Sequence, residues 1–141
     1  MKFVILSLLS ALFLSASSIN HQAKILEKIV SEISLKEQIT IWSDDKDILL
    51  QFENSKKFKT TQYCQNASLI ILKNQNNLQK ICDDAHIFVL NYKLLSDIPK
   101  SFGALFWKKG RPNIVLLEPR IKTQNIKITQ NLEPYLEEKV W

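Results

Sequence analysis

The sequence predicts an α/β fold: a three-layer sandwich with a mostly parallel central sheet, helices on both faces and a C-terminal β-hairpin that extends the sheet. Two continuous apolar runs, Leu69–Leu72 and residues 87–90, are typical of strands covered on both faces. The segment between them is long enough for a right-handed crossover. Two further apolar runs flank residues 108–111, where Gly110 supplies the positive φ that a tight hairpin turn needs.

The chain ahead of the first apolar run predicts a helix, a strand and a second helix. The β-branched run at residues 39–42 is typical of a strand. Residues 43–45 follow as Ser-Asp-Asp, in which the serine is a favoured N-cap and the acids suit the positive end of a helix over residues 47–52. The first helix is predicted over residues 23–35 from the helical spacing of Ile25, Leu26, Ile29, Val30 and Ile33.

The remaining segments are predicted as connections and one terminal helix. Residues 55–61 form a polar, basic loop with a short edge strand, residues 78–81 a short helix, and residues 92–99 a polar connection. Residues 118–119 end the second hairpin strand. The terminal helix carries Pro134 in its first turn, where the missing N–H costs little; its apolar positions are Leu132, Tyr135 and Leu136.

The N-terminus predicts export. Lys2 precedes an apolar run over residues 3–14, and the small residues at positions 15–17 suit a signal peptidase. The run has 12 residues, whereas a bilayer-spanning helix needs about 20. We therefore predict a cleaved secretory signal peptide over residues 1–17 and a single domain over residues 18–141 that is not an integral membrane protein. Abundant Asn, Lys and Ile suggest an AT-rich bacterial genome, and hence the periplasm.

The two cysteines, Cys64 and Cys82, predict a disulfide, because an even number of cysteines in an oxidising compartment usually pairs. Each lies five residues before one of the two apolar runs. Adjacent parallel strands about 4.8 Å apart would bring both to the same end of the sheet, within the Cα separation that a disulfide tolerates. A structural disulfide is favoured, and a redox-sensing disulfide and free thiols stay open.

The sequence offers no catalytic, cofactor or metal-binding set of residues. Gly103 and Gly110 are the only glycines, too few for a dinucleotide fingerprint or a phosphate loop. No motif presents a serine nucleophile beside His86. Residues 82–86 lack the second ligand pair of a zinc site, and residues 44–55 lack the glycine and glutamate of a calcium loop. We predict a protein that is not an enzyme and that takes no cofactor.

Charge and aromatic residues point to protein contacts more than to nucleic acid. The net charge of +5 is mild, and the lysines lie in short separate runs, so nucleic-acid binding is not predicted. Trp42 and Trp107 are expected in the core. Trp141, the last residue, is a candidate contact point for a partner, with packing back on the sheet as the alternative.

Several stretches along the predicted domain are similar to those of a known family. They are residues 23–33 followed by the strand and helix over residues 39–52, with Ile41-Trp42-Ser43-Asp44-Asp45 between them, Cys64 with residues 67–72, Phe102-Gly103-Ala104-Leu105-Phe106, residues 114–117, and the spacing of Ile126, Ile128 and Leu132. In these stretches the predicted domain resembles the YfiR-like family of small periplasmic proteins. It departs from the family at Ala104, where a second glycine is common, and at Cys82, which matches no cysteine of the family.

The resemblance implies a regulatory role, since the family's type member is a periplasmic inhibitor that binds the sensor region of an inner-membrane diguanylate cyclase. We therefore expect a non-enzymatic protein that modulates such a cyclase, or another envelope signalling protein, by contact. The alternative is a binder of a small ligand or envelope component on a flavodoxin-like scaffold, with a crevice near Ser43, Lys73 and Asn91 at the carboxyl ends of the strands. A homodimer through the sheet edge or the first helix is conceivable.

Overall fold

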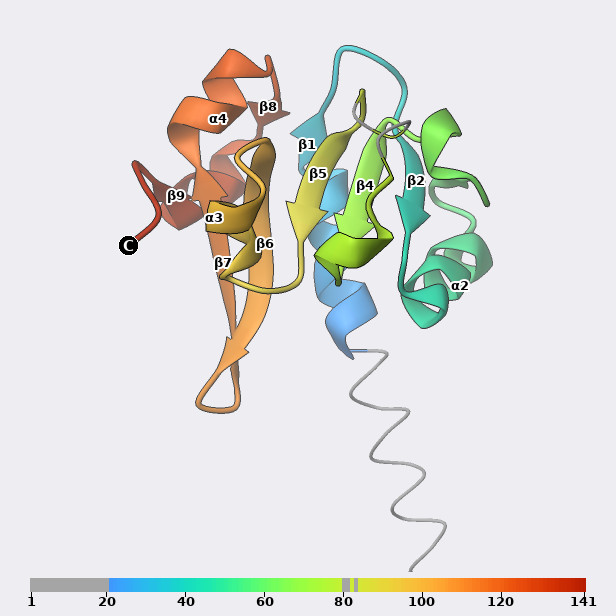
Figure 1. The fold of residues 1–141 in the computed structure, drawn as a ribbon, viewed down its shortest axis with the longest axis horizontal. Helices are drawn as coiled ribbons and strands as arrows, with labels where there is room; N and C mark the ends of the chain where they lie inside the picture. The colour runs from blue at the N-terminus through green and yellow to red at the C-terminus, as the bar shows by residue number, and fades with distance from the viewer. Residues whose placement is uncertain (1–20, 80–81, 83) are drawn as a thin grey trace, which may run out of the picture.

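The computed structural model describes residues 21–79, 82 and 84–141, and it contains a seven-stranded sheet (Figure 1). The strand order is β3-β2-β4-β5-β6-β7-β9, and every neighbouring pair is parallel except β6 and β7. The prediction of an α/β fold with a mostly parallel sheet and a C-terminal hairpin is confirmed. The strands are β2 (Thr40–Ser43), β3 (Lys59–Thr60), β4 (Leu69–Leu72), β5 (His86–Val89), β6 (Ser101–Lys108), β7 (Arg111–Leu117) and β9 (Leu136–Glu137).

The N-terminal helix, described from residue 21 to residue 31, lies behind the sheet in Figure 1. Together with α2 (Lys46–Ser55) and α4 (Glu118–Thr123) it covers one face. Burial of large aliphatic side chains from both layers drives this packing. The core on this side includes Leu26, Ile29, Val30, Ile41, Ile48, Phe52, Leu69, Ile71, Phe102, Leu105 and Ile121.

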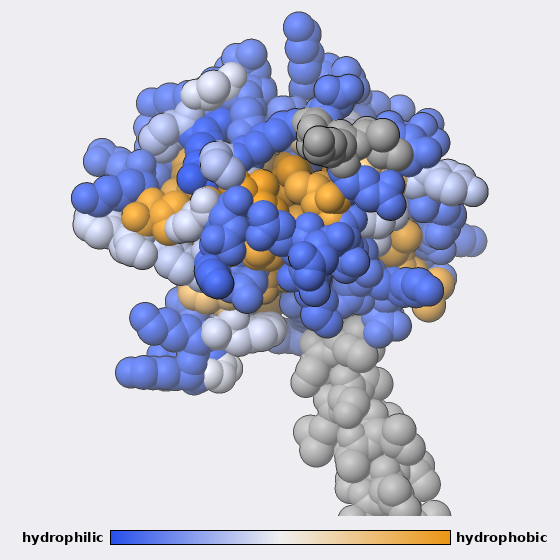
Figure 2. Space-filling model, viewed as in Figure 1, coloured by the Kyte–Doolittle hydropathy of each residue, from blue (hydrophilic) through white to orange (hydrophobic). Residues whose placement is uncertain are grey.

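The opposite face of the sheet is covered by shorter elements, namely α3 (Leu94–Asp97) and the 3₁₀ helices η1 (Cys64–Asn66) and η2 (Gln75–Asn77). Figure 2 views this face, where hydrophobic residues of the sheet show between hydrophilic ones. Its buried residues include Ile70, Leu72, Ile87, Val89, Leu94, Leu95 and Ala104. Because β4 buries alternate residues in both cores, its unbroken apolar run is explained.

The first helix ends about one turn earlier than predicted, because residues 33–34 belong to a second, small sheet. The helix ends at residue 31, and β1 (Ile33–Ser34) pairs antiparallel with β8 (Lys127–Ile128). Ile33 is buried in the core although it belongs to β1. A buried residue at this position is compatible with a helix or with a strand, so the apolar spacing could not tell the two apart.

The C-terminal prediction of an α-helix is wrong. Residues 130–135 form the 3₁₀ helix η4 (Gln130–Tyr135), with Pro134 inside it and not in a first turn, and β9 follows by pairing in parallel with β7. Proline lacks the N–H that an α-helix requires in its interior. Two helices were not predicted. Residues 92–99, predicted as a polar connection, contain α3. The second hairpin strand is followed directly by α4, with Pro119 in its first turn.

Asp45, and not Ser43, is the N-cap of α2. Its carboxylate accepts from the N–H groups of Asp47 (3.0 Å) and Ile48 (3.2 Å). The Ser43 hydroxyl donates to the Ile71 carbonyl instead, at 2.8 Å, and so joins β2 to β4.

The predicted signal peptide (residues 1–17) and part of the predicted helix 78–81 lie outside the described residues. In the part of the chain that is described, no helix has the length and apolar character needed to cross a membrane.

Candidate functional site

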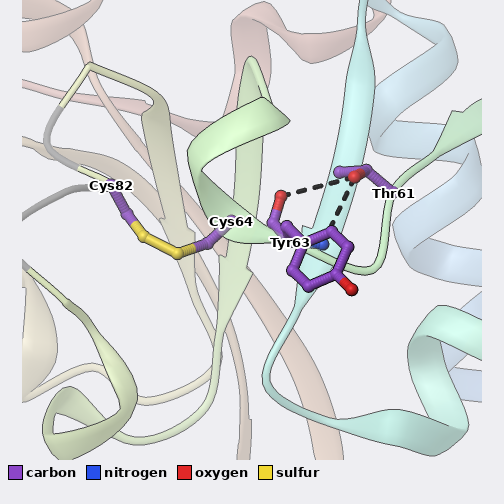
Figure 3. Close-up of a disulfide and its surroundings, with 4 residues drawn as sticks. All are labelled: Thr61, Tyr63, Cys64 and Cys82. Atoms are coloured by element: carbon purple, nitrogen blue, oxygen red, sulfur yellow. Dashed lines mark hydrogen bonds between the residues drawn. A yellow bond between two sulfur atoms is a disulfide. The ribbon is translucent and has the colours of Figure 1, made fainter.

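Cys64 and Cys82 form a disulfide that leads into the two central strands (Figure 3). Their Cα atoms lie 5.5 Å apart, and both residues, of which Cys64 is the first of η1, are buried in the core on this side of the sheet. Tyr63 points away from the bond toward solvent, and its backbone N–H is held by the Thr61 hydroxyl at 3.2 Å. Burial of both sulfur-bearing residues favours a structural role over redox sensing.

A first hollow, of about 470 Å³, lies at the carboxyl ends of β2 and β4, where the ligand-binding alternative places its crevice. The carboxylate of Asp44 accepts from the backbone N–H groups of Lys73 (2.7 Å) and Asn74 (2.9 Å). It also accepts from the side-chain amide of Asn77 at 2.9 Å. Asp45 caps α2 and lies 3.4 Å from the Lys73 ammonium. The carboxylate of Asp44 thus stabilises the turn after β4, and that of Asp45 stabilises the start of α2.

A second hollow, of about 440 Å³, lies at the amino ends of the same strands and includes His86, Ser68 and Gln124. His86 Nδ1 is 2.9 Å from Gln124 Oε1, and Gln124 Nε2 donates to the Lys100 carbonyl at 2.8 Å. Since the Gln124 oxygen faces the ring, Nδ1 carries the proton in this network. In the neutral form of the imidazole, Nε2 is then the nitrogen left to accept a hydrogen bond.

Ser68 does not act as a partner of His86. Its hydroxyl donates to the Gln38 carbonyl at 2.9 Å and accepts from the Thr40 N–H at 2.8 Å. These bonds tie the start of β4 to the chain entering β2. The Ser68 hydroxyl thus has a structural role, and it has no hydrogen bond to a base that would activate it as a nucleophile among the described residues.

A third hollow, of about 520 Å³, is a largely apolar groove between the N-terminal helix, β7 and η4. We call this the helix–hairpin groove. Lys28, Glu32 and Asn131 supply its polar part, while its apolar lining consists of Ile25, Ile29, Pro112, Ile114, Leu132 and Tyr135. Three segments far apart in the sequence meet here, so no local pattern could have revealed it.

Glu32 fastens one wall of the helix–hairpin groove. Its carboxylate accepts from the Thr129 hydroxyl and from the Asn131 amide at 3.3 Å. These two hydrogen bonds, the one from Thr129 above all, hold the pKa of Glu32 below its usual value because they favour the charged form. These contacts join the end of the N-terminal helix to the start of η4.

Trp107 is the clearest departure from the predicted core, because 45% of its surface is exposed. It lies near the end of β6, and among the described residues the ring of His21 stacks on it, at 5.9 Å between centroids. Trp42 packs against the core, as expected.

Trp141, the predicted contact point, is 77% exposed although its backbone is anchored. Its N–H donates to the Tyr92 hydroxyl at 2.8 Å, and the Lys139 ammonium lies 4.3 Å from the ring centroid. The indole N–H also donates to the carboxylate of Glu137, in β9 (Leu136–Glu137), at 3.4 Å. The side chain is thus held at the edge of the sheet, but it is not buried in the core.

Comparison with known proteins adds no relative, since neither any protein-family model nor any curated protein sequence matches this chain.

Proposed function

We propose that this chain is an exported, non-enzymatic regulatory protein that binds an envelope signalling protein through the helix–hairpin groove. The sensor region of a membrane-bound diguanylate cyclase is the partner that the YfiR-like resemblance suggests. The disulfide supports an oxidising compartment. The observation that supports the proposal best is the groove itself, whose floor is aliphatic and whose rim carries the half-exposed Tyr135.

The groove is better suited to a partner than either polar hollow. In the polar hollows Asp44, Asp45 and Ser68 are bonded to the framework, as described above. The groove instead offers apolar surface that none of the described residues fills, and Tyr135 is part of its lining. Aromatic side chains at the edge of an apolar depression are typical of interface positions that contribute most to binding.

Photo-crosslinking in the native host tests the proposal. A benzophenone amino acid replaces Tyr135 at the groove, and in a matched protein it replaces Tyr63, which is 63% exposed beside the disulfide and outside the groove. We expect a single membrane-protein adduct from position 135 and none from position 63. Equal adducts at both positions, or none at position 135, would contradict the groove as the interface.

Activity assays test the non-enzymatic part. A substrate turnover that disappears in His86→Ala would show that the hollow at the amino ends of the strands is an active site. Under our proposal this variant keeps both its fold and its partner adduct.

A small-ligand binder is the second candidate, and the orientation of His86 favours it. Gln124 fixes the ring so that Nε2 can accept a hydrogen bond from a ligand in the second hollow. Thermal-shift screening against periplasmic metabolites tests this, because a ligand that binds only the folded state stabilises it increasingly as its concentration exceeds its Kd. A shift that is lost in His86→Ala would support this function.

A further inference from the structure

The hairpin of β6 and β7 extends past the rest of the domain at the end where the N-terminal helix begins (Figure 1). Its turn is well defined, since Lys108 pairs with Arg111 and the two residues between them have positive φ, 52° at Lys109 and 75° at Gly110. This is the two-residue type I′ turn that matches strand twist. We call residues 107–112 the hairpin tip.

The hairpin tip concentrates positive charge. Lys108, Lys109 and Arg111 are all exposed, and none of them forms an ion pair with a described residue. Residues 98–117 contain no Asp or Glu at all. Figure 2 shows strongly hydrophilic residues gathered where this hairpin ends.

An aromatic side chain accompanies these charges. Trp107 lies opposite Pro112 in the strand register and exposes 45% of its surface. Its indole N–H makes no hydrogen bond with any described residue, and one side of the ring meets His21. A tryptophan with an apolar body and a free N–H is the side chain typically found at the membrane–water interface.

We propose that the hairpin tip docks on an anionic lipid surface. The three cations contact headgroup phosphates, and Trp107 enters the interfacial layer. The acid-free tip, with three exposed cations and an exposed tryptophan, is complementary in charge to a broad negative surface. Each cation near such a surface contributes about a fivefold gain in partitioning.

Vesicle co-sedimentation tests the proposal with the exported protein, whose processing is checked by intact mass. The vesicles are an equal mixture of phosphatidylglycerol and phosphatidylcholine, or phosphatidylcholine alone. At low salt we expect at least ~10-fold stronger partitioning onto the anionic vesicles, and a decline as added salt screens the charges. The variant K108Q/K109Q/R111Q is expected to lose ~100-fold, at about fivefold per charge.

A matched variant separates the hairpin tip from net charge alone. K56Q/K57Q/K59Q removes the same three charges around β3, at the opposite edge of the sheet, where Glu53 lies nearby along the chain. We expect it to keep its partitioning within about twofold, because exposed charges more than a Debye length apart act weakly on each other. Thermal melting of both variants confirms that the fold is retained.

Lipid-depth quenching tests the role of Trp107. Brominated lipids are expected to quench the wild-type fluorescence more than that of Trp107→Ala. Three outcomes overturn the proposal: no preference for anionic vesicles at low salt, equal losses in the two triple variants, or quenching that is unchanged in Trp107→Ala. The vesicle experiments and the crosslinking experiment can fail separately. The crosslinking variant at Tyr135 leaves the three cations of the hairpin tip in place, and vesicle binding requires no protein partner.

Discussion

At the residue scale, Arg120 joins three segments of the fold by hydrogen bonds that the sequence around it does not predict. Its guanidinium donates to the carbonyls of Leu95 at 2.7 Å and Ser101 at 2.9 Å. It thereby satisfies acceptors near the end of α3 and the start of β6. Burial lowers the pKa of Arg120, yet a guanidinium remains charged at any physiological pH.

We expect Arg120→Ala to lower the free energy of unfolding by about 2 kcal/mol, because charge-assisted hydrogen bonds are lost and partly buried carbonyls lose their donor. Urea unfolding measures the change. Arg111→Ala at the hairpin tip is the matched control and should stay within about 0.5 kcal/mol of wild type. Similar losses in the two variants would argue against this role for Arg120.

Glu32 makes stability depend on pH. Its pKa is lowered in the folded state, chiefly by the Thr129 hydroxyl, so its contribution is complete above the ordinary glutamate pKa of about 4.3 and is lost as the pH falls through the lower folded value. We expect Glu32→Gln to melt a few degrees lower at neutral pH and to converge with wild type in acid. Glu138→Gln, whose carboxylate has no described hydrogen bond, should follow wild type throughout.

At the element scale, the disulfide ties the lead-in of β4 to the lead-in of β5. It closes a loop of 18 residues, for which the chain-entropy estimate is about 3 kcal/mol. We expect Cys64→Ala/Cys82→Ala to lose about that much in urea unfolding, and reductant to have little further effect on this variant. Two free thiols in the freshly exported protein, detected by alkylation and intact mass, would contradict the pairing.

At the scale of the whole molecule, the two cores share the same strands. Leu69 and Ile71 of β4 enter one core, while Ile70 and Leu72 enter the other. Neither layer can therefore unfold without exposing the sheet face that it covers. We expect one cooperative transition with equal calorimetric and van't Hoff enthalpies while the disulfide is intact. Two separate heat-capacity peaks would show that the cores unfold independently.

The sequence alone determined the parts whose signal is local. Continuous apolar runs in β4 and β5 predicted buried parallel strands, and Gly110 predicted the hairpin turn. Both features depend on residues that are neighbours in the sequence, so they can be recognised without knowledge of distant contacts. Only the tertiary structure decided the pairing of β1 with β8, the exposure of Trp107 and the helix–hairpin groove. Each of these depends on contacts between segments distant in the chain, and such contacts override local propensity where burial decides the free energy.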